Sequence, residues 1–334
     1  MHRQPPRSRD RARAGVLPVI VAALAGCSGP QSALAPAGVE AEAIARLFWI
    51  MAAGAVLAWL AVCGLALWIG TRRRRRAGLR AARWLILLGA AVPVVVLGAL
   101  LAYGLALMPR LRAPADAGPR IAVTGEQWWW RVRYLRPGAA PVELANEIRL
   151  PVGVRTRFLL DSPDVIHSLW IPALGGKVDM IPGRTNTLVL EPTRTGVFRG
   201  ACAEFCGTSH AFMQLDVVVM EPGAFARWLE QQAAPARAPR EASARQGRDA
   251  FLENGCGACH AIRGTPADGA LGPDLTHVGS RLGLAAGTLP NDVQAFERWI
   301  AHAHAVKPDT PMPEFDMLPD ARLRAIAAYL DDLQ

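Results

Sequence analysis

The chain has 334 residues, 51% of which are apolar, and a formal net charge of +9. That length allows two or three domains, and the apolar share is high for a purely soluble protein. Two arginine-rich segments, residues 1–26 and 71–83, together carry more positive charge than the whole chain, so the other residues are acidic in sum. Because the basic charge does not belong to a folded surface, we expect no nucleic-acid partner.

The first 26 residues have the features of a secretory signal, because arginines precede a short apolar run that ends in small residues. The sequence Leu24-Ala-Gly-Cys27 resembles the end of a bacterial lipoprotein signal, which would leave a lipidated Cys27 as the new N-terminus. An ordinary signal with a chance cysteine is the alternative. In both cases, residues 1–26 are expected to belong to no fold.

Two uncharged stretches, residues 47–70 and 84–108, are each long enough to cross a membrane. The arginines at 72–76 between them mark the connecting segment as cytoplasmic. We therefore expect residues 43–109 to form a two-pass transmembrane hairpin in the inner membrane of a bacterium. The rest of the chain would then lie on the periplasmic, or outer, face. Cys63 falls within the first stretch, where we expect it to have no chemistry.

Residues 110–230 consist of short β-rich runs that Pro, Gly and Asp clusters separate. Such spacing is typical of a β-sandwich or a barrel. The expected strands are 120–124, 128–135, 146–150, 154–160, 187–191 and 214–220, and a short helix is expected at 222–232.

Candidate metal ligands gather in residues 202–213 of this region. Cys202, Cys206, His210 and Met213 offer two thiolates, an imidazole and a thioether, a set that suits copper better than calcium or magnesium. A further histidine, His167, lies where a strand is expected to end. Structural zinc is the alternative for the cysteine pair, although zinc sites favour four Cys or His ligands.

The last part of the chain has a helical pattern. Residues 231–242 are rich in Pro and Ala and are expected to form a semi-rigid linker. A helix is expected at 244–253, with Ser243 as its N-cap, and an amphipathic helix at 319–333.

Between these helices, Cys256-Gly-Ala-Cys259-His260 is the attachment signature of haem c, with two thioether bonds and His260 as an axial ligand. A thioredoxin-like redox pair is the alternative, but its βαβ setting is missing. Met312, in a proline-rich loop, is the expected sixth ligand of the iron, and Met317 is the second choice. Three further histidines could be ligands on chemistry alone and are expected instead to be exposed: His277, His302 and His304.

Together these features resemble subunit II of haem-copper cytochrome c oxidases with a fused class I cytochrome c domain at residues 243–334. The resemblance rests on four motifs: Gly125-Glu-Gln-Trp128-Trp-Trp130, the segment around His167, residues 175–184 and residues 202–213. It implies a transmembrane two-helix hairpin, then an all-β cupredoxin (Greek-key) domain at 110–230, then an all-α class I cytochrome c domain.

The resemblance also implies a binuclear copper centre, CuA, in the cupredoxin domain. Its implied ligands are the two bridging thiolates of Cys202 and Cys206, one imidazole per copper from His167 and His210, the Met213 thioether and the Glu204 carbonyl oxygen. The Glu204 carboxylate is implied to reach a magnesium ion that is shared with subunit I. Electrons are implied to enter the copper domain at Trp128.

The chain is therefore expected to relay electrons from a cytochrome c-type donor through haem c and CuA to the oxygen-reducing site of subunit I. It would act as an oxidoreductase and translocase only with subunit I, and subunit III is a further expected partner. An electron-input subunit of a CuA-containing nitric oxide reductase is the alternative; a copper-delivery lipoprotein is disfavoured because the ligand set is closed. One departure from the resemblance is that residues 83–93 lack the glutamate that many members have at a proton pathway.

Overall fold

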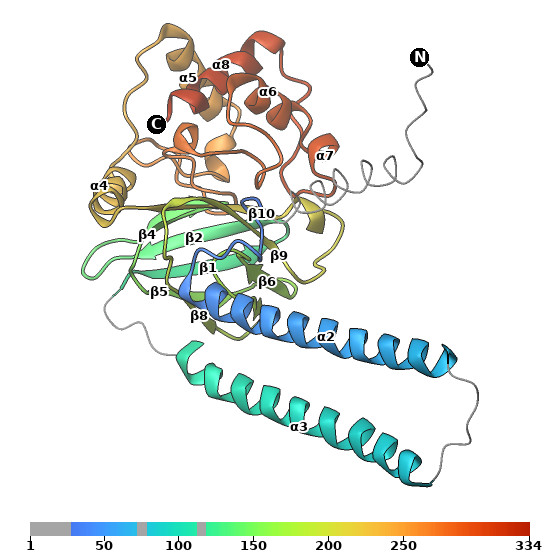
Figure 1. Ribbon diagram of the computed structural model, residues 1–334. Helices are drawn as coiled ribbons and strands as arrows, with labels where there is room; N and C mark the ends of the chain where they lie inside the picture. The colour runs from blue at the N-terminus through green and yellow to red at the C-terminus, as the bar shows by residue number, and fades with distance from the viewer. Residues whose placement is uncertain (1–27, 72–78, 112–117) are drawn as a thin grey trace, which may run out of the picture. The chain divides into compact units, whose positions relative to one another are not determined.

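The computed structural model describes residues 28–71, 79–111 and 118–334 (Figure 1). The expected signal sequence, Cys27 and the arginines at 72–76 lie outside these residues. The chain divides into two compact units, of which one is Glu42–Pro114 and the other contains the rest of the chain.

The unit Glu42–Pro114 contains two long apolar helices, α3 (Leu79–Leu111) and all but the first three residues of α2 (Val39–Thr71). Both are long and apolar enough to cross a membrane, over Val39–Thr71 and Arg83–Met108. Their large side chains are exposed rather than packed in a core; Leu67, for example, is 72% exposed. The expectation of two long apolar helices is confirmed, and both helices extend beyond the uncharged stretches.

The other unit begins with a β-sandwich, whose strands in the described residues form two five-stranded sheets. One sheet has the order β3 (Val142–Ala145), β2 (Trp129–Leu135), β1 (Arg120–Glu126), β5 (Thr156–Asp161) and β8 (Asn186–Leu190). The other has the order β4 (Glu147–Pro151), β10 (Gln214–Met220), β9 (Gly196–Cys202), β6 (His167–Trp170) and β7 (Val178–Met180). One pair in each sheet is parallel, β1 with β5 and β4 with β10, so crossover connections supplement the hairpins.

The core of the sandwich follows from the alternation of side chains along its strands. In β2 and β5, buried residues alternate with half-buried ones. Trp130, Phe158 and Leu160 from one sheet and Leu169 and Leu215 from the other are fully buried. Burying each such side chain stabilises the fold by about 1.5–3 kcal/mol. The two sheets therefore form a rigid frame for the loops at their ends.

The helix expected after the strands is α4 (Pro222–Ala233). It buries Phe225 and Trp228, and the Trp228 ring meets the Tyr134 ring of β2 edge to face at 5.3 Å. At the other end of the sequence, residues just before and within the start of α2 also pack on the sandwich. The Ala37 amide donates to the Ala173 carbonyl at 2.6 Å, and the Glu40 carboxylate accepts the Glu191 amide at 3.0 Å.

The C-terminal part is helical. Its elements are α5 (Ala242–Glu253), η2 (Cys256–Ala258), η3 (Val278–Ser280), α6 (Val293–Ala301), α7 (Ala303–Val306) and α8 (Asp320–Asp332). Helices α5 and α8 cross so closely that a Cβ on Gly247 would lie 1.8 Å from the Ala325 carbonyl oxygen, so glycine is needed there. The expectation that Ser243 caps α5 is wrong, because the helix begins earlier and Glu241 holds the cap position without a side-chain hydrogen bond.

Candidate metal and haem sites

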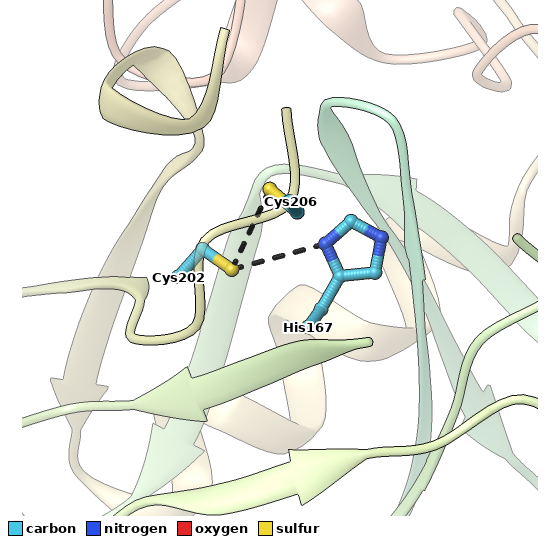
Figure 2. Close-up of side chains that lie close together, drawn as sticks. All are labelled: His167, Cys202 and Cys206. Atoms are coloured by element: carbon cyan, nitrogen blue, oxygen red, sulfur yellow. Dashed lines mark hydrogen bonds between the residues drawn. The ribbon is translucent and has the colours of Figure 1, made fainter. Parts of the chain in front are cut away.

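Two cysteines and one histidine form a buried cluster in the β-sandwich (Figure 2). The ligand atoms of His167, Cys202 and Cys206 all lie within 4.8 Å of one another. The Cys202 sulfur is 3.9 Å from the Cys206 sulfur and 3.8 Å from His167 Nδ1. Both cysteines are free. Two thiols and an imidazole that face one another in a buried space fit a soft metal ion.

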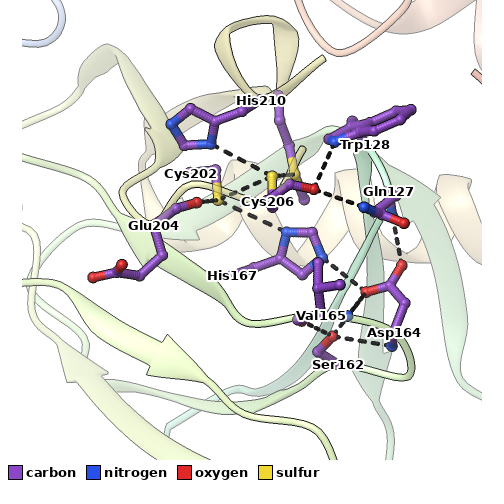
Figure 3. A network of polar contacts seen from close by, with 11 residues as sticks. Gln127, Trp128, Ser162, Asp164, Val165, His167, Cys202, Glu204, Cys206 and His210 are labelled. Carbon is purple, nitrogen blue, oxygen red and sulfur yellow. Dashed lines mark hydrogen bonds and ion pairs between the residues drawn. The ribbon is translucent and has the colours of Figure 1, made fainter. Parts of the chain in front are cut away.

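Three further donors surround this cluster, as Figure 3 shows for His210 and Glu204. His210 Nδ1 lies 3.4 Å and Met213 Sδ 3.9 Å from the Cys206 sulfur. The backbone oxygen of Glu204 lies 3.1 Å from the Cys202 sulfur. The structure thus brings together all six residues that the sequence singles out as metal ligands.

The strands explain why these side chains meet. Strand β9 ends at Cys202, and β6 pairs with it. The expectation that a strand ends at His167 is wrong, because β6 begins at this residue and the preceding strand, β5, ends at Asp161. The loop after Cys202 returns to β10 through the short helix η1 (His210–Phe212), and the Cys202 amide donates to the Met213 carbonyl at 3.0 Å. Gly207 in this loop has a φ of +117°, a conformation that L side chains rarely adopt.

The electrostatics of the cluster favour metal binding. A hydrogen bond from the Cys206 thiol lowers the pKa of Cys202 to about 4, and the same pairing raises the pKa of Cys206. One thiolate therefore forms readily, and the second needs an additional positive charge beside it. A bound metal cation would supply that charge. Thiolates are also the form of cysteine that binds metals.

Asp164 orients the His167 ring, and the sequence did not reveal this role. Its carboxylate lies 2.9 Å from His167 Nε2 and accepts backbone hydrogen bonds from Gln127 and Val165 at 2.7 and 2.6 Å (Figure 3). This contact occupies Nε2 and leaves Nδ1 directed toward the sulfurs. Carboxylates commonly hold metal-binding histidines in this way. Asp164 and His167 are close in the sequence, so a turn can bring their side chains together. The contact itself is visible only in the fold.

Gly125 leaves room for the same ring. A Cβ at this position would lie 2.9 Å from His167 Cγ, so we expect Gly125→Ala to displace the imidazole from the cluster. Losing ligand orientation of this kind costs roughly 10–100-fold in metal affinity. Copper content after dialysis against a competing chelator would measure the loss. Gly223→Ala in α4 is the control, because its Cβ would have ordinary contacts; equal copper retention in both variants would contradict the prediction.

Trp128 lies against the cysteine loop. Its ring Nε1 donates to the Cys206 carbonyl at 3.0 Å, and Gln127 Nε2 donates to the same oxygen at 2.7 Å. The Trp128 side chain is buried. The indole is therefore hydrogen-bonded to the backbone of a candidate metal ligand. A residue that is electronically coupled to the metal would need such a position.

The backbone carbonyl and the side-chain carboxylate of Glu204 have different partners. Its carbonyl oxygen is directed toward Cys202, whereas its half-exposed carboxylate forms an ion pair with Lys177 at 2.7 Å. Lys177 also pairs with Asp179 at 3.2 Å. Two carboxylates thus share one lysine at the surface beside the cluster, and one lysine does not neutralise both.

The surroundings of His260, in the Cys-x-x-Cys-His segment, suit an axial ligand of a haem iron. Its Nδ1 lies 2.8 Å from the Pro273 carbonyl oxygen, which leaves Nε2 as the ligand nitrogen. Burial lowers its pKa, so the imidazole is neutral, as an iron ligand must be. A Cβ on Gly272 would lie 2.5 Å from this ring. Cys256 begins and Cys259 follows the η2 turn, and both are half-buried and free. These residues fit a covalently bound haem.

The two candidate methionines differ in their surroundings. Met312 is half-buried and packs against the core of the helical domain, whereas Met317 is 71% exposed. His302 and His304 are exposed, as expected. The same expectation for His277 is wrong: it is buried, and its nitrogens lie 3.0 and 3.3 Å from backbone oxygens of the linker and the C-terminal residue.

Comparisons with known proteins match two parts of the chain to two different families. The family described as cytochrome C oxidase subunit II, periplasmic domain, matches residues 135–220, and the cytochrome c family matches residues 244–334. Cytochrome c oxidase subunit 2 of Alkalihalophilus pseudofirmus is 40% identical over 214 residues, which cover 64% of this chain and 61% of the relative. Its counterpart in Bacillus subtilis is 30% identical over 224 residues, or 64% of this chain and 62% of the relative.

One similar solved structure is the periplasmic domain of subunit II of cytochrome oxidase from Bradyrhizobium japonicum. It is 36% identical, with 36% of this chain and 95% of that chain covered and a TM-score of 0.34. The chain spans about three fifths of the length of the curated relatives that it matches.

The chain therefore combines two apolar helices, a cupredoxin-type sandwich and a cytochrome c domain, as the sequence predicted. The resemblance to subunit II of cytochrome c oxidases with a fused cytochrome c domain is confirmed.

Proposed function

We propose that this chain is the electron-input subunit of a membrane-bound cytochrome c oxidase, and that it passes electrons through haem c and CuA to the haem-copper site of subunit I. The observation that carries this proposal is the convergence of six soft or neutral donors, Cys202 and Cys206 among them, on a chain that also has a haem-attachment motif.

The copper site would use every donor of the cluster. The Cys202 and Cys206 thiolates, the Nδ1 atoms of His167 and His210, the Met213 thioether and the Glu204 carbonyl oxygen would hold the copper. When bound, the copper pair supplies a one-electron relay. The protein holds all donors on a buried frame, which limits rearrangement and leaves no open position for a substrate.

The haem site would use Cys256 and Cys259 for covalent attachment and His260 as one axial ligand. The Pro273 carbonyl fixes the tautomer of His260, and Met312 in the proline-rich loop would be the second ligand of the iron. When bound, haem c supplies a second one-electron carrier.

The rest of the proposal concerns location and partners. Helices α2 and α3 would anchor the chain in the bacterial inner membrane, with the copper and haem domains in the periplasm. Its partners would be subunits I and III and a soluble cytochrome c-type donor, and activity would require subunit I. The expected signal and the lipidation of Cys27 belong to this proposal and lie outside the described residues.

Purification of the intact complex tests the terminal acceptor. With a reduced cytochrome c as donor, we expect the complex to consume oxygen. Consumption of nitric oxide with no oxygen uptake would replace the oxidase by the nitric oxide reductase alternative.

The axial methionine can be tested separately. We expect Met312→Ala to keep the covalent haem and to lose the weak sulfur-to-iron absorption band of the oxidised protein, because the thioether is removed. Met317→Ala is the control and should keep the band, since this side chain is exposed. Loss of the band in Met317→Ala alone would assign the ligand to Met317.

The carboxylate of Glu204 can be tested in the assembled oxidase. If it reaches a magnesium ion at subunit I, Glu204→Ala should change the resonance spectrum of manganese substituted for that ion, while the CuA signal persists. Glu221→Ala, an exposed acid of the same domain, serves as the control. An unchanged manganese spectrum in Glu204→Ala would remove this role.

A further inference from the structure

The cytochrome c domain and the copper domain, which belong to the same compact unit, are joined by hydrogen bonds beside the cysteine loop. Lys307 Nζ donates to the Trp128 carbonyl oxygen at 2.5 Å. The next residue, Pro308, accepts a hydrogen bond from the Ser209 hydroxyl, also at 2.5 Å. Two consecutive residues of one domain thus contact two separate segments of the other.

The position of these contacts links the two candidate cofactor sites. On the copper side, the Trp128 ring donates to the Cys206 carbonyl, and Ser209 directly precedes His210. On the haem side, Lys307 and Pro308 begin the loop Lys-Pro-Asp-Thr-Pro that leads to Met312. The loop of the proposed iron ligand is therefore attached to the loop of the proposed copper ligands.

The burial of Lys307 is unusual for a lysine. The residue is 2% exposed, and within the described residues no carboxylate forms an ion pair with it. Among the described residues, the hydrogen-bond acceptors of its amino group are carbonyl oxygens, those of Trp128 and, at 3.5 Å, Ala285. Burial lowers its pKa to about 7. Burying an amino group is costly unless it is well hydrogen-bonded, so this lysine depends on the copper domain for its partner.

Other side chains of the sandwich form hydrogen bonds with backbone groups of the cytochrome c domain. The Glu147 carboxylate accepts the Leu282 amide at 2.8 Å, and Arg131 Nη2 donates to the Ala270 carbonyl at 3.0 Å. The ion pairs of Arg131 with Glu143, Arg149 with Glu147 and Arg322 with Glu253 each stay within one domain. The contact is thus built from directed hydrogen bonds, which fix an orientation more narrowly than charge attraction does.

We propose that Lys307 is a positioning residue that latches the cytochrome c domain onto Trp128 and so sets the rate of electron transfer from haem c to CuA. This inference rests on the proposed function. In the step concerned, one electron leaves the ferrous haem, which becomes ferric, and the oxidised copper pair gains that electron; no bond forms and no proton moves. Because Trp128 is buried and its carbonyl oxygen is bound by Lys307, a soluble donor delivers electrons to the haem.

The test uses the full-length chain with haem and copper bound. Lys307→Met keeps the length of the side chain and removes the hydrogen bond and the charge, and Ser209→Ala removes the second contact. Arg324→Met, an exposed cation of α8, is the matched control. Hydrogen–deuterium exchange of residues 127–131 and 307–312 reports whether the domains stay docked, and flash reduction of the haem reports the transfer rate.

We expect Lys307→Met to accelerate exchange in both segments and to slow haem-to-copper transfer at least about tenfold, because the buried hydrogen bond to the Trp128 carbonyl is lost and that oxygen is left without this donor. Haem and copper spectra should remain those of the unmodified chain, and Ser209→Ala should show a smaller effect in the same direction. Unchanged exchange and rate in Lys307→Met would overturn the latch. If the unmodified chain shows no transfer from haem to copper, the relay itself fails, whereas the exchange result still decides the latch.

Discussion

Cys206→Ser is expected to abolish the mixed-valence copper signal of the full-length chain in electron paramagnetic resonance. The Cys206 sulfur lies close to the sulfur of Cys202, the imidazole of His210 and the thioether of Met213, so its removal takes away the centre of the cluster. A serine hydroxyl is a hard, weakly acidic donor and does not replace a bridging thiolate. We expect copper content to fall from two ions per chain to one or none.

Cys63→Ser provides the matched control, because this cysteine lies in α2 and outside the cluster. It should keep both coppers and the signal. A wild-type chain that loads a single copper, or that binds zinc in preference, would contradict the assignment more strongly than any variant.

The second large effect concerns the haem. Replacing Cys256 and Cys259 together by alanine is expected to abolish covalent haem, because these thiols are the only proposed attachment points for it. Haem staining after denaturing electrophoresis, together with the mass of the chain, measures the loss. The copper signal should persist, since the cysteine cluster of the sandwich is a separate site. Covalent haem that survives in the double variant would refute the motif assignment.

Much of the sandwich could be predicted because its long strands alternate buried and half-buried residues, as β2 and β5 do. The strands that sequence reasoning missed are β3, β6, β7 and β9. β7 has three residues, and β6 begins with three consecutive buried residues, so neither shows a period of two. Glycines interrupt β9, although it carries Cys202.

The donor set of the copper site could be predicted because its chemistry is concentrated in residues 202–213, and only His167 is distant in sequence. The residues that support it could not. Asp164, Ser209 and Lys307 act through contacts between segments far apart in the chain, or through a turn whose shape depends on the fold. His277 was misjudged for the same reason, because the linker and the C-terminus cover it.

The order of reduction tests the central claim most directly. The full-length chain, loaded with haem and copper, is mixed rapidly with a soluble reduced cytochrome c, and the haem and copper absorptions are followed together. We predict that haem c is reduced first and is then reoxidised as CuA accepts the electron, and that the Cys256, Cys259 double variant reduces its copper much more slowly. Copper that is reduced before the haem, at the same rate with and without the haem, would contradict the account.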